Sequence, residues 1–155
     1  EDFPDLPAVN RGFGGSAYAD LDRHIGRIAA AHRPRTVVVY SGDNDIASGG
    51  APEKVFQDFA SFAGKLHALR PDARLLVFST KPSTARWDKW PAIQDLNARV
   101  AKWCDETPWA EYVDTVPVSL GPDGLPRKDL LQKDGLHLNR EGYRLWAEVL
   151  RRHAP

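Results

Sequence analysis

The amino-acid sequence predicts a three-layer α/β/α sandwich, in which helices cover both faces of a flavodoxin-like parallel sheet. Two observations lead to this fold class. Apolar runs without alternation, such as residues 36–40 and 74–79, take turns along the chain with segments whose apolar residues recur at helical spacing. A strand that is apolar on both sides needs cover on both faces, which a parallel sheet beneath helices provides. The 155 residues, 42% of them hydrophobic, are enough for one such domain, residues 1–155.

The first part of the chain predicts a strand, a loop and a helix. Residues 6–10 form a short apolar run that is stopped by a glycine-rich turn at residues 11–16. The predicted helix extends from about residue 16 to residue 32, because apolar residues recur on one of its faces. These residues are Leu21, Ile25, Ile28 and Ala29. The turn lacks the full dinucleotide-binding spacing and the lysine of a phosphate loop, so neither site is predicted.

Polar residues follow the strand predicted at residues 36–40. Past its carboxyl end stand Ser41, Gly42, Asp43, Asn44 and Asp45. In open α/β sheets, ligands bind at this end of the strands. An ordinary Gly-Asp-Asn turn would explain the same residues, so this segment does not by itself establish a site.

The centre of the chain predicts a helix at residues 53–69 and a buried strand at residues 74–79. Residues 80–91 are polar but include Trp87 and Trp90. Two indoles in a loop form either a platform for a sugar or acyl group or a cover packed over the next helix, and both interpretations stay open.

The last part of the chain predicts two helices separated by a strand and a long loop. The helices are predicted at residues 92–104 and 140–153, the strand at residues 111–114, and residues 115–133 form a loop rich in proline and glycine. The residues expected to face inward from the final helix are Tyr143, Leu145, Trp146, Val149 and Leu150.

Asp134 and His137 stand three residues apart in the sequence DGLHLN, just before the final helix. In a loop, the carboxylate can accept a hydrogen bond from one imidazole nitrogen and leave the other to take a proton from a nucleophile or water. Histidine side chains titrate near neutrality and suit this role. The competing interpretation is an aspartate that caps its own loop beside a bystander histidine. Because right-handed crossovers bring the carboxyl ends of parallel strands to one edge, the Gly15, Asn44 and His137 loops should converge there.

Composition excludes several classes of function. Lysine and arginine equal aspartate and glutamate at 21 each, so no basic field favours nucleic acid or an anionic membrane. No apolar run approaches the length of a membrane span. Cys104 is the single cysteine, which excludes an internal disulfide. We predict no cofactor and no metal, since His24, His32, His67 and His153 are scattered and are interpreted as solvated or helix-surface residues.

The quoted segments resemble a known family. NRGFGGS at residues 10–16, GDND at residues 42–45 and DGLH at residues 134–137 are similar to the second, third and fifth sequence blocks of the SGNH, or GDSL-type, esterases and lipases. The resemblance covers essentially the whole chain and implies a sheet of strand order 2-1-3-4-5. It also implies that the Gly15 backbone N–H and the Asn44 amide form an oxyanion hole, with His137 as general base oriented by Asp134.

One block of the family is missing. Its first block, a strand ending in Gly-Asp-Ser or Gly-Ser-Ser with the nucleophilic serine, should lie upstream, and this sequence begins too late to contain it. Neither Ser16 nor Ser41 is a convincing replacement. The missing strand would lie between residues 8–10 and residues 36–40, leaving both without a neighbour. We therefore expect the domain to be N-terminally incomplete here, with a further N-terminal segment or a separate polypeptide completing the sheet.

These features together predict a serine esterase that cleaves a small-molecule ester, carrying a small acyl group, a lipid or an acylated sugar, through an acyl-enzyme. The alternative is a non-catalytic domain, either a pseudoenzyme that binds a ligand in the same cleft or a scaffold for a partner. A flavodoxin-like nucleotide or phosphate binder is a third hypothesis, but the sequence lacks a phosphate loop.

Overall fold

The sheet is built on β2 (Arg74–Phe78). In the computed structural model, which describes residues 8–30 and 32–153, β2 lies between β1 (Thr36–Val39) and β3 (Ala110–Val113) and pairs with both in parallel. Parallel pairing brings the carboxyl ends of all three strands to the same edge. The loops that follow these strands therefore start side by side.

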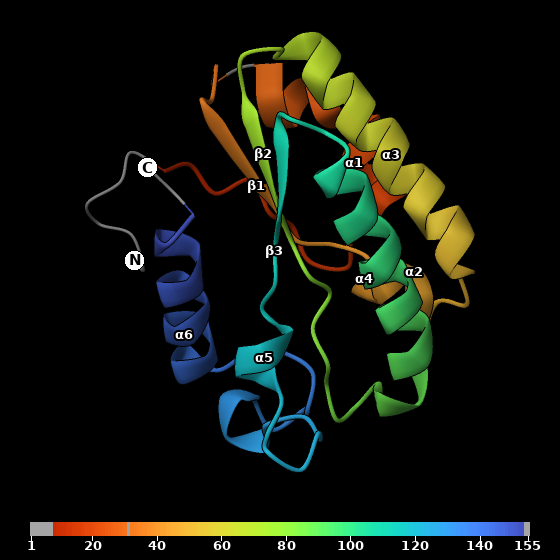
Figure 1. Ribbon diagram of the computed structural model, residues 1–155, viewed down its shortest axis with the longest axis vertical. Coiled ribbons are helices and arrows are strands. Elements are labelled where there is room, and N and C mark those ends of the chain that lie inside the picture. Colours follow the sequence, from red (N-terminus) through yellow and green to blue (C-terminus); the bar gives the residue numbers. More distant parts are fainter. Residues whose placement is uncertain (1–7, 31, 154–155) are drawn as a thin grey trace.

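Side chains of β2 alternate between two hydrophobic clusters, one on each face of the sheet. Leu75 and Val77 join the larger cluster, whereas Leu76 and Phe78 join the smaller one. Leu75, Leu76 and Val77 have no exposed surface. The strand is therefore covered on both faces, which confirms the predicted three-layer sandwich (Figure 1).

Helices on one face pack against the larger cluster. They are α1 (Tyr18–Arg23), the short α2 (Asp43–Ala47), α3 (Pro52–Leu69) and α4 (Trp90–Asp105), and the 3₁₀ turn η2 (Trp87–Lys89) leads into α4. Both long helices begin with a proline in the first turn, where the missing N–H costs no hydrogen bond. The predictions at residues 53–69 and 92–104 are confirmed, with α4 starting two residues earlier than expected.

The other face is covered by α6 (Arg140–Arg151), with α5 (Val116–Ser119) and the 3₁₀ turn η3 (Lys128–Leu130) in the connection before it (Figure 1). The side chain of Asn139 caps α6 by accepting a hydrogen bond from the Gly142 N–H at 3.0 Å. The prediction that Tyr143 faces inward is wrong, since its side chain is exposed. It lies at the solvent margin of the buried stripe of α6.

The amino-terminal part of the described chain differs from its prediction. Residues 8–10 form no strand and Val9 is exposed, because no strand of the described residues runs beside them; residues 6 and 7 lie outside the described residues. The helix predicted from residue 16 to residue 32 is also wrong in extent. It divides into α1 and a π-helical turn, η1 (Gly26–Ala30), with Gly26, a weak helix former, at the junction.

β1 is less buried than its composition predicts. Val38 is 45% exposed and Tyr40, just past the strand, is 36% exposed, although Val39 is buried. Among the described strands β1 pairs with β2 alone, so it forms an edge of the sheet. The prediction that residues 36–40 are apolar and covered on both faces is therefore only half correct.

Candidate functional site

Asp134 and His137 form a hydrogen-bonded pair in the loop before α6. The Nδ1 atom of His137 lies 2.6 Å from Oδ2 of Asp134. The other carboxylate oxygen, Oδ1, accepts hydrogen bonds from the backbone N–H groups of Leu136 and His137 at 2.9 and 3.0 Å. The local turn thus fixes the carboxylate, and the carboxylate orients the imidazole with Nε2 directed away from it.

These hydrogen bonds stabilise the ionised form of Asp134. The contact with His137 is the largest cause, followed by the Leu136 and His137 backbone donors, and together they lower the pKa of Asp134 to about 2. The carboxylate is therefore charged at any neutral or mildly acidic pH. A fixed negative charge beside Nδ1 stabilises positive charge on the ring, which is what a general base acquires when it takes a proton.

The position of Asn44 depends on a tight turn after β1. Gly42 has a φ of 101°, a left-handed conformation, and a Cβ atom there would lie 2.8 Å from the side chain of Leu96 and 2.9 Å from Oγ1 of Thr80. Glycine is thus required both by the left-handed φ angle and by the lack of space for a Cβ atom. The turn leads directly into α2, whose first two residues are Asp43 and Asn44.

Asn44 reaches the glycine-rich loop that precedes α1. Its Nδ2 donates a hydrogen bond to the backbone carbonyl of Ser16 at 3.1 Å, and Ser16 immediately follows Gly15. Next to it, Asp45 accepts a hydrogen bond from the Tyr18 N–H at 3.0 Å. The segments around Gly15 and Asn44, which lie about 30 residues apart in the sequence, therefore meet at the carboxyl edge of the sheet.

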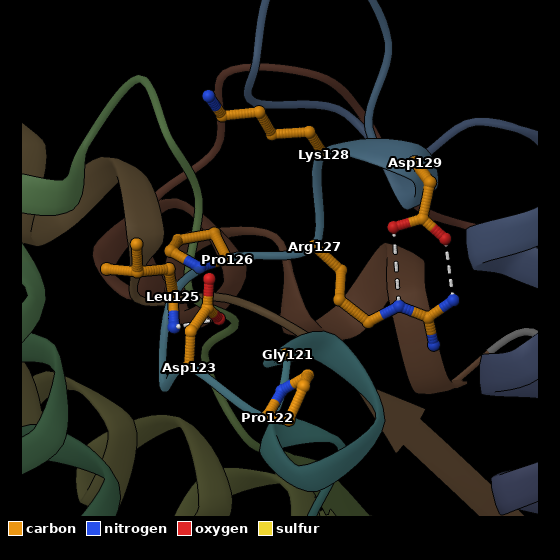
Figure 2. A pocket seen from close by; sticks show the side chains of 8 residues that line it. All are labelled: Gly121, Pro122, Asp123, Leu125, Pro126, Arg127, Lys128 and Asp129. Carbon is orange, nitrogen blue, oxygen red and sulfur yellow. Dashed lines mark hydrogen bonds and ion pairs between the residues drawn. The ribbon is translucent and has the colours of Figure 1, made fainter.

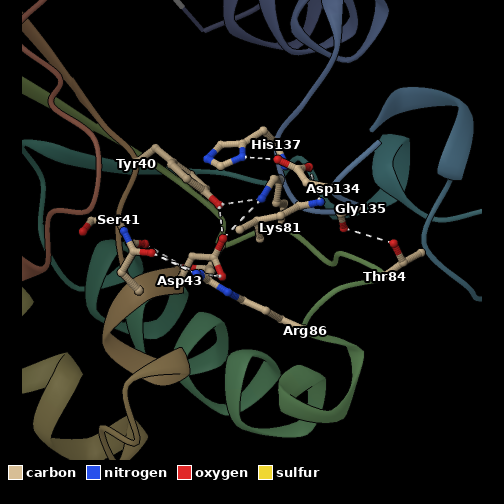
Figure 3. Close-up of polar contacts among 12 residues, drawn as sticks. Tyr40, Ser41, Asp43, Lys81, Thr84, Arg86, Asp134, Gly135 and His137 are labelled. Atoms are coloured by element: carbon tan, nitrogen blue, oxygen red, sulfur yellow. Dashed lines mark hydrogen bonds and ion pairs between the residues drawn. The ribbon is translucent and has the colours of Figure 1, made fainter. Parts of the chain in front are cut away.

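A loop at residues 81–86, after β2, joins the two halves of the site. Oγ1 of Thr84 and the N–H of Ala85 both donate to the carbonyl of Gly135, each at 3.0 Å. At the end of this loop, Arg86 donates to Oδ1 of Asn44 from both terminal nitrogens, at 3.1 and 3.2 Å. Figure 3 shows the loop between the Asp134–His137 pair and the start of α2. The 81–86 loop thus connects the segment of Asp134 and His137 with the segment of Asn44.

A cluster of charged side chains, Asp43, Lys81 and Arg86, lies between the Asp134–His137 pair and the start of α2 (Figure 3). Asp43 accepts from Arg86 at 2.7 Å and from Lys81 at 3.2 Å, and the Tyr40 hydroxyl lies 3.4 Å from the same carboxylate (Figure 3). Lys81 is 5% exposed. Burial lowers the pKa of Lys81, while the negative charge of Asp43 acts against this shift.

Sequence reasoning did not identify Lys81 and Arg86. The sequence of residues 80–91 predicts a polar loop with two indoles and assigns no role to its charged residues. The signal was present, because this loop follows a buried strand at its carboxyl end, the same position that singled out Asp43 and Asn44. The two indoles instead stack with their ring centroids 5.7 Å apart, and both pack against the larger hydrophobic cluster.

Ser16 and Ser41, the two serines weighed as replacements for the nucleophile, form no hydrogen bond with His137 in the described part of the chain. Ser16 donates its hydroxyl to the carbonyl of Phe13 at 3.0 Å. The hydroxyl of Ser41 is buried and has no hydrogen-bond partner among the described residues.

The remaining histidines lie in other surroundings. His67 lies partly buried in the last turn of α3 and stacks face to face on Trp109 with ring centroids 4.2 Å apart, so of the two interpretations, solvated or helix-surface, the second describes it. The other three contact Phe13, Arg11 and Glu111, in the order His24, His32 and His153.

Two surface hollows lie away from the paired residues. A hollow of about 460 Å³ is lined by residues of the 121–129 loop, including the ion pair of Arg127 and Asp129 (Figure 2). Another, of about 290 Å³, is lined by Arg11, Phe13, His24, Arg27 and Ile28. Across residues 8–30 and 32–153, no cluster of three or more acidic, histidine or cysteine side chains is placed to hold a metal ion. Within the same part of the chain, no helix is long and apolar enough to cross a bilayer.

Comparison with known proteins identifies relatives of the sequence and of the fold. The sequence profile of the GDSL-like Lipase/Acylhydrolase family matches residues 1–145. Among curated proteins, none is a significant match. A GDSL-like lipase from Bacteroides thetaiotaomicron is similar in structure, with a TM-score of 0.84 and 22% identity, over 98% of this chain and 77% of that one.

Two carbohydrate esterases of family 3 share the fold as well. The structure from Talaromyces cellulolyticus has a TM-score of 0.73 and 19% identity, over 96% of this chain and 75% of its own. The structure from Clostridium thermocellum has a TM-score of 0.74 and 18% identity, over 95% of this chain and 69% of its own. At these identities the similarity concerns the arrangement of strands and helices.

Proposed function

Because the chain belongs to the GDSL-like lipase/acylhydrolase family, we propose that it is a serine esterase or acylhydrolase that cleaves carboxylic esters through an acyl-enzyme. One observation carries the proposal. The Asp134–His137 pair and the Asn44 amide beside the Gly15 loop are held at the same edge of the sheet by the 81–86 loop. A base and a set of neutral donors at one place are what acyl transfer requires.

His137 acts as the general base in this proposal. Its Nε2 takes the proton of the attacking serine hydroxyl as the oxygen bonds to the ester carbonyl, and then returns the proton to the departing alcohol. Asp134 keeps Nδ1 protonated and stabilises the imidazolium. In the second step, Nε2 takes a proton from water as the water attacks the acyl carbonyl, and it returns that proton to the serine oxygen as the acid is released.

The Gly15 N–H and the Asn44 Nδ2–H group donate hydrogen bonds to the carbonyl oxygen, on which negative charge develops as the serine attacks. Both are neutral donors, so they keep their hydrogens at any working pH. Held in place before the reaction, such donors stabilise the charge without rearrangement, and the loss of one typically slows the reaction about 100- to 1,000-fold.

We place the attacking serine on a further segment that pairs with the edge of β1 facing away from β2. The exposed Val38 supports this placement, because a β-branched side chain on an apolar strand is usually covered by the side chains of a neighbouring strand. The open edge of β1 supports it as well. Such a strand would end beside Asn44 and His137, at the carboxyl edge.

The substrate class is a carboxylic ester of a small acyl group, a lipid or an acylated sugar. The lipase and the two carbohydrate esterases that share this fold support esters of both kinds. The equal numbers of acidic and basic residues give the molecule no overall field to select a charged substrate.

A second function is a non-catalytic domain that binds a ligand at the same edge of the sheet. It is favoured by one observation, that no serine hydroxyl of the described residues is hydrogen-bonded to His137. In that case Asp134 and His137 would contribute binding contacts and no turnover.

Hydrolysis of p-nitrophenyl acetate by the protein expressed from its full reading frame tests the proposal. We expect His137→Ala to lower kcat by at least about 100-fold, because general-base catalysis of this kind contributes that much. The matched control is His153→Ala, which removes an imidazole paired with Glu111 at the opposite end of the strands. Native hydrolysis that survives in His137→Ala would contradict the proposed base. Tight ligand binding without hydrolysis would favour the binding domain.

A further inference from the structure

Arg86 lies between the side chains of Asp43 and Asn44, and the proposed reaction gives Arg86 no role. Its Nη1 donates to Oδ1 of Asp43 at 2.7 Å, and Nη1 and Nη2 both donate to Oδ1 of Asn44 at 3.2 and 3.1 Å. Figure 3 shows the Arg86 guanidinium reaching Asp43 from the far end of the 81–86 loop. Arg86 is partly buried, and Asp43 more deeply so.

The neighbours of Asn44 fix which end of its amide is oxygen. A guanidinium has donors and no acceptor, so the atom of Asn44 that faces Arg86 must be the oxygen. On the opposite side the carbonyl of Ser16 is an acceptor and requires the nitrogen. The two contacts agree, and rotation of the amide by 180° would place two donors against each other and two acceptors against each other.

This arrangement leaves one amide hydrogen of Asn44 for a substrate. The NH₂ group carries two hydrogens, and the carbonyl of Ser16 accepts one of them at 3.1 Å. The other has no partner among the described residues. A positive charge on the oxygen side also draws electron density from the amide, which makes the free N–H a stronger donor.

We propose that Arg86 is the positioning residue of the oxyanion hole, since it fixes and polarises the amide of Asn44 without contacting the substrate. The inference rests on the proposed esterase function, and it names the residue that makes Asn44 an effective donor. Asp43 holds Arg86 in turn, and the buried Lys81 balances the second oxygen of Asp43 at 3.2 Å. The amide therefore depends on a chain of charges that reaches into the protein.

The first test observes the amide directly. The side-chain ¹⁵N–¹H₂ signals of Asn44 are assigned by their loss in Asn44→Ala, and their order parameter is measured in the native protein and in Arg86→Met. Methionine has a similar length and no donor. We expect an ordered amide in the native protein and a clearly lower order parameter in the variant. An unchanged order parameter in Arg86→Met overturns the proposal.

A matched variant controls for the loss of an arginine. Arg99 pairs with Asp95 and Glu53 on the surface of α3 and α4, so Arg99→Met removes an equal charge elsewhere. It should leave the Asn44 signals unchanged. Thermal unfolding of all variants identifies any that fail to fold, and Arg86→Lys, which keeps the charge next to Asp43, serves where Arg86→Met is unstable.

The second test separates positioning from substrate binding. For p-nitrophenyl acetate, we expect Arg86→Met to lower kcat about tenfold or more with KM changed less than twofold, because an oxyanion contact forms in the transition state. Arg86→Lys should lie between. A raised KM at constant kcat means that Arg86 binds substrate and overturns the proposal. If the native protein hydrolyses no ester, the proposed function fails, and the order parameter still decides whether Arg86 positions Asn44.

Discussion

At the scale of a residue, the spacing of Asp134 and His137 in the sequence determines the hydrogen bonds that the Asp134 carboxylate makes. Two residues of spacer allow its carboxylate to bind both the His137 ring and the backbone N–H groups of the same turn. Gly135 has a φ of 65° in this turn, and a Cβ there would lie 2.3 Å from Oγ1 of Thr84. The pairing of Asp134 with His137 could be predicted from sequence because the hydrogen bonds of the Asp134 carboxylate all lie within four residues.

The pKa of Asp134 gives a prediction for stability. The shift from 3.8 to about 2 means that the ionised carboxylate stabilises the fold. Because the pKa is lowered in the folded state, this contribution is present above pH 4 and is lost as the pH falls toward 2. The difference in unfolding free energy between the native protein and Asp134→Asn should therefore shrink between pH 5 and pH 2.5, as measured by urea denaturation. A difference that stays constant would contradict this account.

Arg86 and Lys81 show where prediction from residues fails. Their partner Asp43 lies about 40 residues away in the sequence, and nothing local distinguishes them from solvated charges. Parallel strands bring the loops together, so the partners become visible only when the order of the strands is known.

At the scale of elements, the long helices and buried strands follow from their own sequence. The apolar residues of α3 recur every three or four positions and pack as expected, and β2 is buried from Leu75 to Phe78. In contrast, residues 8–10 and η1 depend on neighbours that the local pattern does not contain. Strand pairing and the break in a helix are decided by what lies alongside, so these two predictions were wrong.

The junction of β2 and α4 provides a prediction for the element scale. Asn97 accepts a hydrogen bond from the Thr80 N–H at 2.8 Å and donates to the Thr80 carbonyl at 2.9 Å, and all of these groups are buried. Asn97→Ala leaves both backbone groups unpaired, which should cost about 2–5 kcal/mol of stability. Chemical denaturation measures the loss. The Asn97→Ala substitution would also loosen the start of the 81–86 loop, which directly follows Thr80.

Gln57 provides the comparison for this change. It is an amide on α3 that bonds to Glu53 at the surface, and Gln57→Ala should change stability by less than about 0.5 kcal/mol. Equal losses in the two variants would show that the amide of Asn97 has no special role at the strand end.

At the scale of the whole molecule, the sheet is unevenly protected. β2 has a neighbour on each side, whereas β1 has one among the described strands and exposes Val38. The sequence resemblance implied two more strands beyond β1, and the three described strands agree in order with the other half of that sheet. The remaining half of that sheet depends on a strand that pairs with the edge of β1 facing away from β2.

Amide hydrogen exchange should report this difference. In a protein limited to residues 1–155, we expect the amides of β2 to exchange most slowly and those of β1 faster. In the protein from the full reading frame, the proposed further strand should slow exchange in β1 to a rate near that of β2. Exchange in β1 that is the same in both proteins would contradict a strand at this edge.

Covalent trapping tests most directly whether this site forms an acyl-enzyme with His137 as its base. The full-reading-frame protein and His137→Ala are treated with a fluorophosphonate, and their intact masses are followed with time. We predict that the native protein gains one phosphonyl group on a serine and that His137→Ala reacts at least about 100-fold more slowly. The absence of an adduct on the native protein, or equal rates in both proteins, would contradict the account.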